Sequence, residues 1–293
     1  ILGFSCRRLP LRDDGRIDEV RALARIRLAL ELGINLFDTV RPGREAETVL
    51  GRALAGIRDR VFLCAGTDGE GDIGALLADR LTRLDTPYLD FFCLYGLGRE
   101  RWPRLRESGV LETLAAAKAA GKVRFLGFAC HDSYPVFAEI AAAFPWDFCQ
   151  VQFNFLDENF QAGLKGVELA VSRGMGVMAT EPLKGGHLAR RQPPAVQAVW
   201  DSLSVRRSPA EWALRWVWGW GEVATALSGM VEEDMLRENC HIAGEAVPYS
   251  LTDDEREAVA RVRALYERDL KVGCTGCGWC LPCPYGVDIP GAF

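Results

Sequence analysis

Eight short apolar runs recur along the sequence at a regular interval, and this alternation constrains the fold more than any other feature. The predicted strands are Leu2–Ser5, Asn35–Asp38, Val61–Cys64, Leu89–Leu94, Phe125–Ala129, Phe148–Phe153, Gly176–Ala179 and Ala224–Leu227. Helical periodicity fills most intervals, as in Ile17–Leu32, Ile73–Leu84, Val110–Ala120 and Pro209–Trp218. Eight strands that alternate with helices are typical of a closed parallel (α/β)8 TIM barrel, with a doubly wound sheet as the competing fold.

We expect the chain to divide near residue 244. Residues 1–243 hold the predicted barrel, whose last helix should begin near Glu232. Residues 244–293 contain a linker, a C-terminal helix and a cysteine-rich tail. Thr252 and Glu255 have the spacing of a capping box, so the C-terminal helix should start there and run to about Leu270.

Composition excludes several classes of partner. The net charge of −5 and the lack of a Lys/Arg run give no reason to expect nucleic acid. No apolar run approaches the roughly 20 residues of a membrane span, and we see no signal peptide. Ten cysteines without secretory features favour a reducing cytoplasm and metal binding over disulfides.

The tail brings four cysteines together with three successive gaps of two residues. They are Cys274, Cys277, Cys280 and Cys283, and Pro284 follows the last one. Such a compact array favours a 4Fe-4S cluster. A four-cysteine zinc site is the alternative, although zinc sites usually consist of two pairs separated by a long loop. Disulfides are disfavoured by the expected compartment.

In barrel enzymes the chemistry takes place at the carboxyl ends of the strands. Here Asp38, Tyr95 and His131 stand at such ends. Each also has a structural reading, as a helix cap, a half-buried aromatic or a surface histidine. Cys64 and Cys93 should face inward one layer below, most simply as small buried apolar groups.

Several segments, in this order, resemble landmarks of the aldo/keto reductase family. They are Gly33–Thr39, Glu45–Gly51, Gly127 and Phe128 with His131, Gln152–Asn154, Glu181–Gly186, and Ser228–Met230 with Glu238 and Asn239. The cysteine tail is similar to that of a ferredoxin-tailed subfamily. The resemblance covers nearly the whole chain and implies a barrel that transfers hydride from NADPH, or NADH, to a carbonyl.

The resemblance also implies a catalytic set of Asp, Tyr, Lys and His, from which this sequence departs. Asp38 matches the aspartate, but no tyrosine follows it closely. The third strand ends in Ala65, Gly66 and Thr67 where the lysine is expected, and the fourth ends in Tyr95 instead of histidine. The set is therefore degraded. We predict that Asp38 and Tyr95 carry catalysis, assisted by His131.

Cofactor contacts follow from the same resemblance. The implied residues are Gln152, Asn154, Ser228, Gly229, Glu238 and Asn239. The helix after the eighth strand opens with Glu232, Glu233 and Asp234. Carboxylates suit a helix N-terminus but oppose a phosphate there, so we expect weak dinucleotide binding or little preference for a 2′-phosphate.

Three functions remain open at this point. The first is an iron–sulfur oxidoreductase for a small carbonyl or hydroxy substrate, with an electron-transfer protein as a further partner. The second is a non-hydride enzyme, a lyase, dehydratase or sulfur-handling enzyme that uses cluster iron as a Lewis acid. The third is a catalytically inactive barrel that senses redox state or binds a partner. We favour the first.

Overall fold

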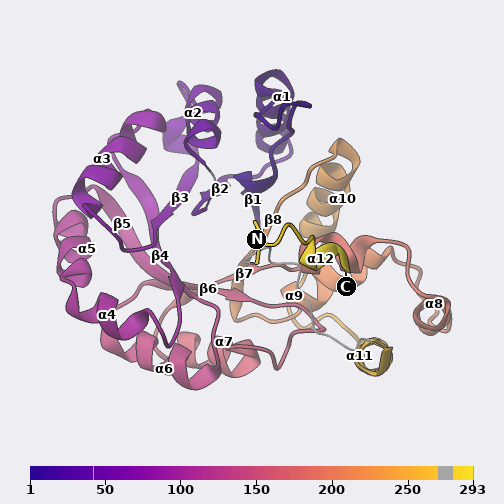
Figure 1. The fold of residues 1–293 in the computed structure, drawn as a ribbon. Coiled ribbons are helices and arrows are strands. Elements are labelled where there is room, and N and C mark those ends of the chain that lie inside the picture. Colours follow the sequence, from indigo (N-terminus) through magenta and orange to yellow (C-terminus); the bar gives the residue numbers. More distant parts are fainter. Residues whose placement is uncertain (42, 270–279, 293) are drawn as a thin grey trace.

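The computed structural model describes residues 1–41, 43–269 and 280–292. Its strands form one closed parallel barrel in chain order, with β8 paired to β1 (Figure 1). They are β1 (Leu2–Ser5), β2 (Leu36–Thr39), β3 (Phe62–Thr67), β4 (Leu89–Leu97), β5 (Val123–Cys130), β6 (Phe148–Gln152), β7 (Gly176–Thr180) and β8 (Val223–Ser228). The (α/β)8 barrel is confirmed, and a doubly wound sheet is excluded because this sheet closes.

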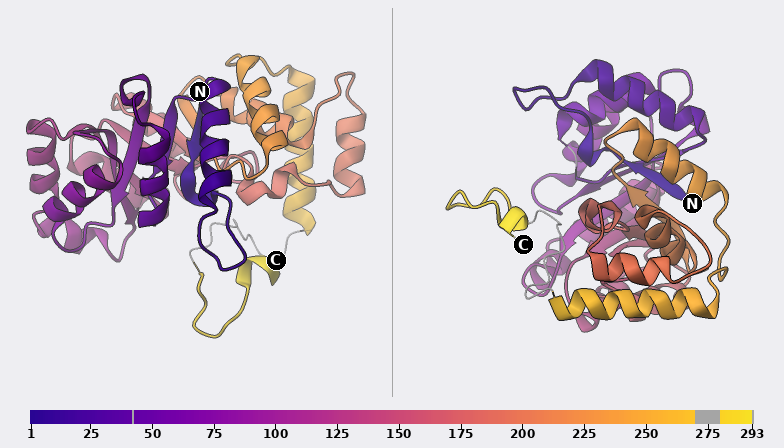
Figure 2. Two further views of the ribbon diagram at one scale, coloured as in Figure 1. Left: turned by 90° about the horizontal axis from the view of Figure 1, so that it is seen from above. Right: turned by 90° about the vertical axis from the view of Figure 1, so that its right-hand side faces the viewer.

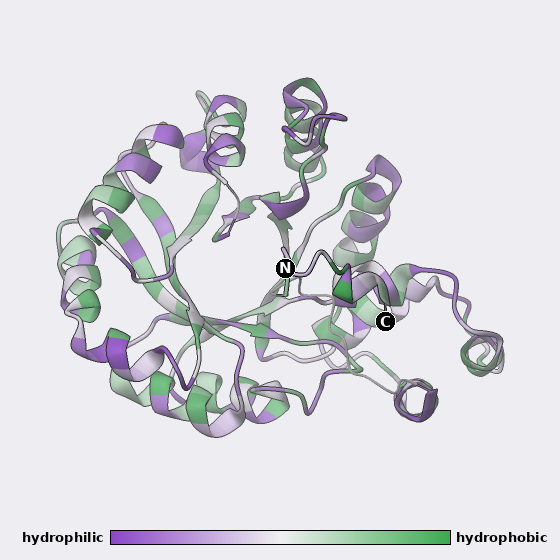
Figure 3. Ribbon diagram, in the orientation of Figure 1, coloured by the Kyte–Doolittle hydropathy of each residue, from purple (hydrophilic) through white to green (hydrophobic). Residues whose placement is uncertain are grey.

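Helices cover the outside of the barrel. They are α1 (Glu19–Glu31), α2 (Arg44–Ala53), α3 (Ile73–Arg83), α4 (Trp102–Glu107), α5 (Val110–Ala119), α6 (Tyr134–Ala143), α7 (Gly163–Ser172), α8 (Pro194–Asp201), α9 (Pro209–Trp218) and α10 (Glu233–Gly244). Most combine hydrophobic and hydrophilic residues (Figure 3). Their apolar sides supply fully buried residues such as Ile26, Leu50 and Leu114 to one core. Burial of these apolar surfaces holds the helices on the sheet.

The inside of the barrel is filled by side chains that alternate along each strand. Cys64 and Cys93 are fully buried there with Leu36, Phe148 and Met178. Burial raises the pKa of both thiols well above the usual value, so they are protonated and pack as small apolar groups. These side chains fill the barrel interior below the carboxyl ends of the strands.

The C-terminal helix α11 (Asp253–Asp269) begins at the capping box. The Glu255 amide donates to Thr252 Oγ1 at 3.3 Å, and the Thr252 amide donates to a Glu255 carboxylate oxygen at 2.9 Å. Val259 and Val262 belong to the same core as the barrel helices. The helix therefore packs as part of the barrel body, and the division at residue 244 stays a prediction.

Residues 270–279 lie outside the described residues, and Cys274 and Cys277 are among them. Cys280 and Cys283 are free thiols, followed by the short helix α12 (Ile289–Ala292). Both views of Figure 2 show this part of the tail beyond the end of the barrel opposite Ile1, where the strands end. In the described part of the chain, no helix combines the length and apolarity needed to cross a membrane.

Candidate active site at the barrel mouth

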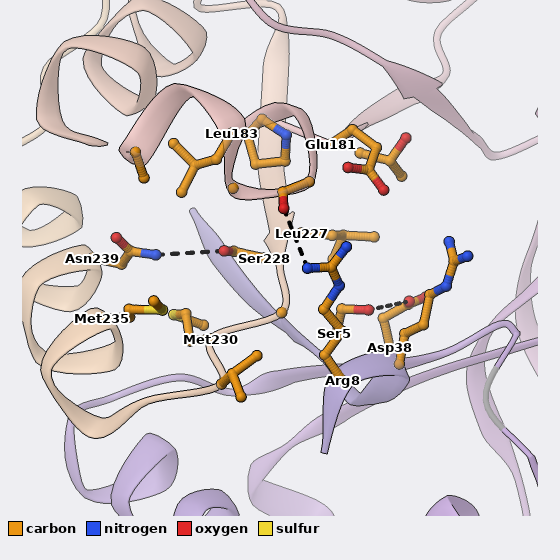
Figure 4. Close-up of a pocket in the computed structure, with 18 of the residues that line it drawn as sticks. Ser5, Arg8, Asp38, Glu181, Leu183, Leu227, Ser228, Met230, Met235 and Asn239 are labelled. Atoms are coloured by element: carbon orange, nitrogen blue, oxygen red, sulfur yellow. Dashed lines mark hydrogen bonds between the residues drawn. The ribbon is translucent and has the colours of Figure 1, made fainter. Parts of the chain in front are cut away.

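A cavity of about 330 Å³ opens at the carboxyl ends of the strands. Its lining contains these residues predicted from the sequence: Asp38, Tyr95, His131, Ser228, Gly229, Glu238 and Asn239. The three predicted catalytic residues thus share one cavity with four of the six predicted cofactor residues. Figure 4 shows Asp38 with Ser5 on one side of this cavity and Ser228, Met235 and Asn239 on the other.

Asp38 lies on β2 and points into the cavity with only 8% of its surface exposed. Gln150 Nε2 donates to its Oδ1 at 3.2 Å and Ser5 Oγ to its Oδ2 at 3.4 Å, while the Cys64 thiol is a further donor. No salt bridge of Asp38 occurs within residues 1–41, 43–269 and 280–292. Burial therefore outweighs these neutral donors and raises the pKa of Asp38 to about 6.

Tyr95 lies beside Gly66, one of the residues at the end of β3 where the family resemblance leads one to expect a lysine. A Cβ atom on Gly66 would stand 2.6 Å from the Cys93 carbonyl oxygen and 3.1 Å from the Tyr95 ring. Only glycine fits there, because the Cys93 oxygen belongs to the backbone, and the Tyr95 ring packs beside Gly66. The guanidinium carbon of Arg41 lies 5.6 Å from the ring centroid. Burial raises the pKa of Tyr95 above its usual value.

His131 follows β5 and faces the same cavity. Its Nδ1 lies 3.3 Å from Gln161 Oε1, which fixes the ring from the loop after β6. Burial lowers the pKa of His131 to about 4, and the positive charges of Arg41 and Arg7 act in the same direction. The imidazole is consequently neutral at physiological pH.

Gln152 and Asn154 belong to a buried cluster of polar side chains, and the cofactor role predicted for them stays a prediction. Gln152 Nε2 and Asn154 Nδ2 each donate to Asp157 Oδ2 at 2.8 Å, and neither residue lines the described cavity. Lys184 Nζ lies 2.7 and 2.9 Å from the two Asp157 oxygens. These side chains form a buried cluster, in which the amide oxygen of Gln152 is left without a hydrogen-bond partner among the described residues.

This cluster holds the loop after β7 in a strained conformation. Glu181, Lys184, Gly185 and Gly186 all have positive φ angles, of 52°, 47°, 65° and 93°. Asn154 Nδ2 donates to the Glu181 carbonyl at 3.0 Å, which adds a second tie beside the Lys184 ion pair. Such a conformation persists only where its surroundings fix it. The loop can therefore form a rigid wall of the cavity.

The opposite wall comes from the end of β8 and from α10. Asn239 Nδ2 donates to Ser228 Oγ at 3.4 Å, and Met235 lies next to them (Figure 4). The first turn of α10 contains Glu233 and Asp234, as expected from the sequence. The wall thus offers amide and hydroxyl groups inside the cavity and negative charge at the start of the helix.

Strand-end reasoning missed other residues that line the cavity. Gln150 lies two residues before Gln152 on the same inward face of β6, so period-2 alternation was the signal that could have found it. Arg8 points into the cavity and donates to the Gly185 carbonyl at 3.2 Å (Figure 4). Its contact joins the loops after β1 and β7, which are 177 residues apart. A contact between residues so far apart in the sequence cannot be predicted from a local pattern.

Two further cysteines at strand ends do not belong to the cavity lining. Cys6 and Cys130 are buried in the core between strands and helices. Within the described residues no group of three or more His, Cys, Asp or Glu could hold a metal ion. Two of the four tail cysteines lie outside those residues.

Known proteins that resemble this chain share its fold, and the similarity covers the residues of the cavity. The family model described as "Aldo/keto reductase family" matches residues 8–262. The holo form of the aldo-keto reductase AKR11C1 from Bacillus halodurans is 25% identical and has a TM-score of 0.74, covering 89% of this chain and 91% of that chain. An aldo-keto reductase from Klebsiella pneumoniae in complex with NADPH is 20% identical, with a TM-score of 0.69 and coverage of 89% and 90%.

Among curated proteins, methylglyoxal reductase YeaE from Escherichia coli (strain K12) is 36% identical over 115 residues. That match spans 36% of this chain and 37% of the relative, about a third of each. The family model covers most of the chain, including the cavity residues from Asp38 to Asn239. The chain therefore belongs to the aldo/keto reductase family.

Proposed function

We propose that this protein is a nicotinamide-dependent oxidoreductase that reduces a small carbonyl compound at the barrel mouth, with Asp38 exchanging the proton. The observation that carries the proposal is the shared cavity. Asp38, Tyr95 and His131 face one part of it, and Ser228 and Asn239 face another. A site for hydride transfer needs both a proton-exchanging group and room for a dinucleotide beside the substrate.

The wall formed by β8 and α10 offers polar groups to a dinucleotide but opposes an additional phosphate group. Ser228 and Asn239 supply hydroxyl and amide groups, and Gly229 keeps the backbone accessible. Glu233 and Asp234 oppose an additional phosphate at the start of α10. We therefore propose binding of NADPH and NADH with little discrimination between them. When bound, the nicotinamide would supply the hydride.

The roles of the three catalytic residues follow from their protonation. Asp38, with a pKa of about 6, is partly protonated near neutral pH and can give a proton to the developing alkoxide. Tyr95 is a weaker acid because burial raises its pKa. His131 is neutral, with a pKa of about 4, and because its Nδ1–H donates to Gln161 Oε1, its Nε2 is left as an acceptor for a hydroxyl group of the substrate or product. We assign orientation of the carbonyl to the hydroxyl group of Tyr95, with His131 assisting as an acceptor.

We also propose that Cys274, Cys277, Cys280 and Cys283 bind a 4Fe-4S cluster. The spacing of the cysteines supports this ligand set, and Cys280 and Cys283 are free thiols. The described part of the tail lies on the mouth side of the barrel (Figure 2). A cluster there would be suited to exchanging electrons with a partner protein. Iron and sulfide analysis after anaerobic reconstitution, with Cys280→Ser as the variant, tests the assignment.

The two alternative functions receive less support. A lyase that uses cluster iron needs an iron without a cysteine ligand, whereas the sequence offers four cysteines. An inactive barrel should have a filled mouth, but the described residues leave a cavity of about 330 Å³ whose lining includes Asp38, Tyr95 and His131.

The decisive experiment is a titration of NADPH and NADH into anaerobically reconstituted protein, read by tryptophan fluorescence. We expect saturable binding of both cofactors with a Kd on the order of micromolar. Reduction of methylglyoxal, the substrate named for the curated relative, is then assayed by cofactor oxidation. Absence of binding at millimolar cofactor, with the cluster intact, would overturn the hydride-transfer proposal.

A further inference from the structure

The loop after β7 supplies a large part of the cavity lining. Its first half is held by the buried ion pair of Lys184 and Asp157. Gly185 and Gly186 follow with positive φ angles, and glycine restricts the backbone less than any other residue does. The second half of the loop, which reaches Arg190 in the cavity lining, therefore needs support of its own.

Gln192 holds the second half of this loop. It directly follows the loop and is only 7% exposed. Its Nε2 donates to the Leu188 carbonyl at 3.2 Å and to the Arg190 carbonyl at 2.6 Å. One amide group thus fixes two backbone carbonyls, but its own buried oxygen still requires a donor.

The donor for Gln192 comes from the C-terminal helix α11. Tyr266 Oη donates to Gln192 Oε1 at 2.6 Å, although the two residues are 74 positions apart in the sequence. The buried ring of Tyr266 also meets the ring of His187, with 6.0 Å between the centroids. The helix lies outside the barrel (Figure 1), and none of the residues Asp253–Asp269 lines the cavity. Tyr266 therefore contacts the loop and not the space that the loop encloses.

A second side chain of α11 contacts the loop after β6. Arg263 lies three residues before Tyr266, so both are on one face of the helix. Arg263 Nε donates to the Phe155 carbonyl at 2.6 Å, and its guanidinium group forms an ion pair with Glu158. The same loop carries Asp157, the partner of Lys184. These contacts fix α11 beside the mouth and give Tyr266 a defined position from which to hold the β7 loop.

We propose that Tyr266 is a positioning residue for the dinucleotide, which acts through Gln192 to hold the β7 loop in its binding conformation. This inference rests on the proposed reductase function and extends it to a helix outside the cavity. A dinucleotide bound against Ser228 and Asn239 would meet the β7 loop on the facing wall of the same cavity. A loop that is fixed in advance loses no further conformational entropy when the ligand binds, whereas a loop released at one end does.

Tyr266→Phe tests the hydroxyl group and keeps the aromatic ring beside His187. The variant leaves the Gln192 oxygen without its donor. We expect the Kd of NADPH to rise by about 3- to 10-fold, the effect of a single hydrogen bond. At saturating cofactor, kcat for methylglyoxal reduction should not fall and its KM should be unchanged. The pH profile of kcat should also stay in place, because the donors around Asp38 are not altered.

Two controls separate positioning from stability. Thr252→Ala removes the capping box at the other end of α11, so it should lower the free energy of unfolding and leave the Kd of NADPH unchanged. Gln192→Leu should raise the Kd by itself. Tyr266→Phe added to Gln192→Leu should have no further effect on the Kd, because the hydroxyl group then has no amide oxygen to hold.

Limited trypsin digestion reports on the loop without any measurement of activity. Arg190 and Arg191 are exposed immediately before Gln192. In cofactor-free protein, cleavage after these two arginines should be faster in Tyr266→Phe than in wild type or Thr252→Ala, because the loop opens locally more often. Saturating NADPH should slow this cleavage in all three proteins.

The outcomes separate this inference from the proposed function. Equal Kd values for wild type and Tyr266→Phe overturn the positioning role and leave the reductase in place, whether or not cleavage is faster. A Kd raised as much by Thr252→Ala as by Tyr266→Phe reflects general loosening of α11 and also overturns it. A raised Kd in Tyr266→Phe alone, with faster cleavage at the loop, supports it. If wild type binds neither NADPH nor NADH, this inference and the proposed function both fail.

Discussion

Asp38 and Asp157 are two buried carboxylates at the same end of the barrel, with 8% and 5% of their surfaces exposed. Asp157 has a buried cation, since Lys184 Nζ lies 2.7 Å from its Oδ1, and two amides complete its shell. Asp38 has neutral donors from Ser5, Gln150 and Cys64, and the described residues supply no salt bridge to it.

The difference teaches that burial alone does not mark a functional carboxylate. A buried charge that is paired and fully hydrogen-bonded serves the fold, here by holding the loop after β7. A buried carboxylate without a cation instead has a raised pKa, which suits proton exchange near neutral pH. We expect substitutions at the two sites to separate activity from stability.

The largest effect is expected from Asp38→Asn, because the amide cannot exchange a proton. We predict that kcat for methylglyoxal reduction falls by about 10²- to 10⁴-fold. In wild type, kcat should fall as pH rises through about 6, since reduction needs the protonated acid. The variant should lose this pH dependence. Nearly unchanged kcat in Asp38→Asn would transfer the donor role to Tyr95.

Lys184→Met should act on stability instead. It leaves Asp157 buried without its cation, which we expect to cost about 3–5 kcal/mol in the free energy of unfolding. Urea unfolding measures this, and the double variant with Asp157→Asn should recover part of the loss. Arg104→Met breaks an exposed ion pair with Glu70 and should cost only about 0–1 kcal/mol. If Lys184→Met and Arg104→Met lowered the free energy of unfolding equally, the buried pair of Lys184 and Asp157 would have no special role in stability.

Asp38→Asn should also make the protein more stable at high pH. The folded state raises the pKa of Asp38 from 3.8 to about 6, so it binds this proton more tightly than the unfolded chain does. The associated stability is present below about pH 4 and is lost as pH rises to about 6. Asparagine resembles the protonated form. At pH 8 we therefore expect the variant to gain up to about 3 kcal/mol over wild type, a gain that disappears near pH 4.

Urea unfolding of cofactor-free protein at pH 4 and pH 8 measures this difference. A variant less stable than wild type at pH 8 would show that Asp38 is ionised at little cost. The environment of Asp38 would then stabilise the carboxylate, as the environment of Asp157 does. Asp38 would no longer hold a proton near neutral pH, and its assignment as the proton donor would have to be withdrawn.

Much of the fold could be predicted from the sequence because its signals are local. Alternation of apolar runs and helical periodicity predicted all eight strands, although two of them extend well beyond their predicted carboxyl ends: β3 ends at Thr67 and not at Cys64, and β4 ends at Leu97 and not at Leu94. The extra residues of β4 follow an irregularity in the pairing of β4 with β5 after Leu94, beyond which Leu97 pairs with Cys130, and the apolar alternation does not predict it. The capping box of Thr252 and Glu255 was equally local and is confirmed.

Site residues could be predicted only where they stand at the carboxyl end of a strand, because that position fixes on which side of the barrel the residue lies. Asp38, Tyr95 and His131 line one cavity because parallel strands end on the same side. Gln152 and Asn154 are not in the lining of this cavity, and both donate to Asp157 in the loop that follows β6. That partnership depends on loop geometry and on Lys184, which lies 27 residues further along the chain. Composition and spacing carry no signal for it.

The smallest effect we predict concerns Gln150, whose Nε2 donates to Asp38 Oδ1 at 3.2 Å. This bond favours the ionised form, so Gln150→Leu should raise the pKa of Asp38 further. A hydrogen bond of about 1 kcal/mol corresponds to a rise of roughly 0.7 pH units in the fall of kcat. The pH profile of kcat measures it.

Gln152→Leu is the matched control for this variant, because it removes an equal side chain two residues away on the same strand. Gln152 donates to Asp157, so its loss should lower the free energy of unfolding and leave the pH profile of kcat in place. If the profile moves as far in Gln152→Leu as in Gln150→Leu, the two carboxylates titrate as one network. Protonation of Asp38 would then be governed by the Lys184 cluster, and not by its own neutral surroundings.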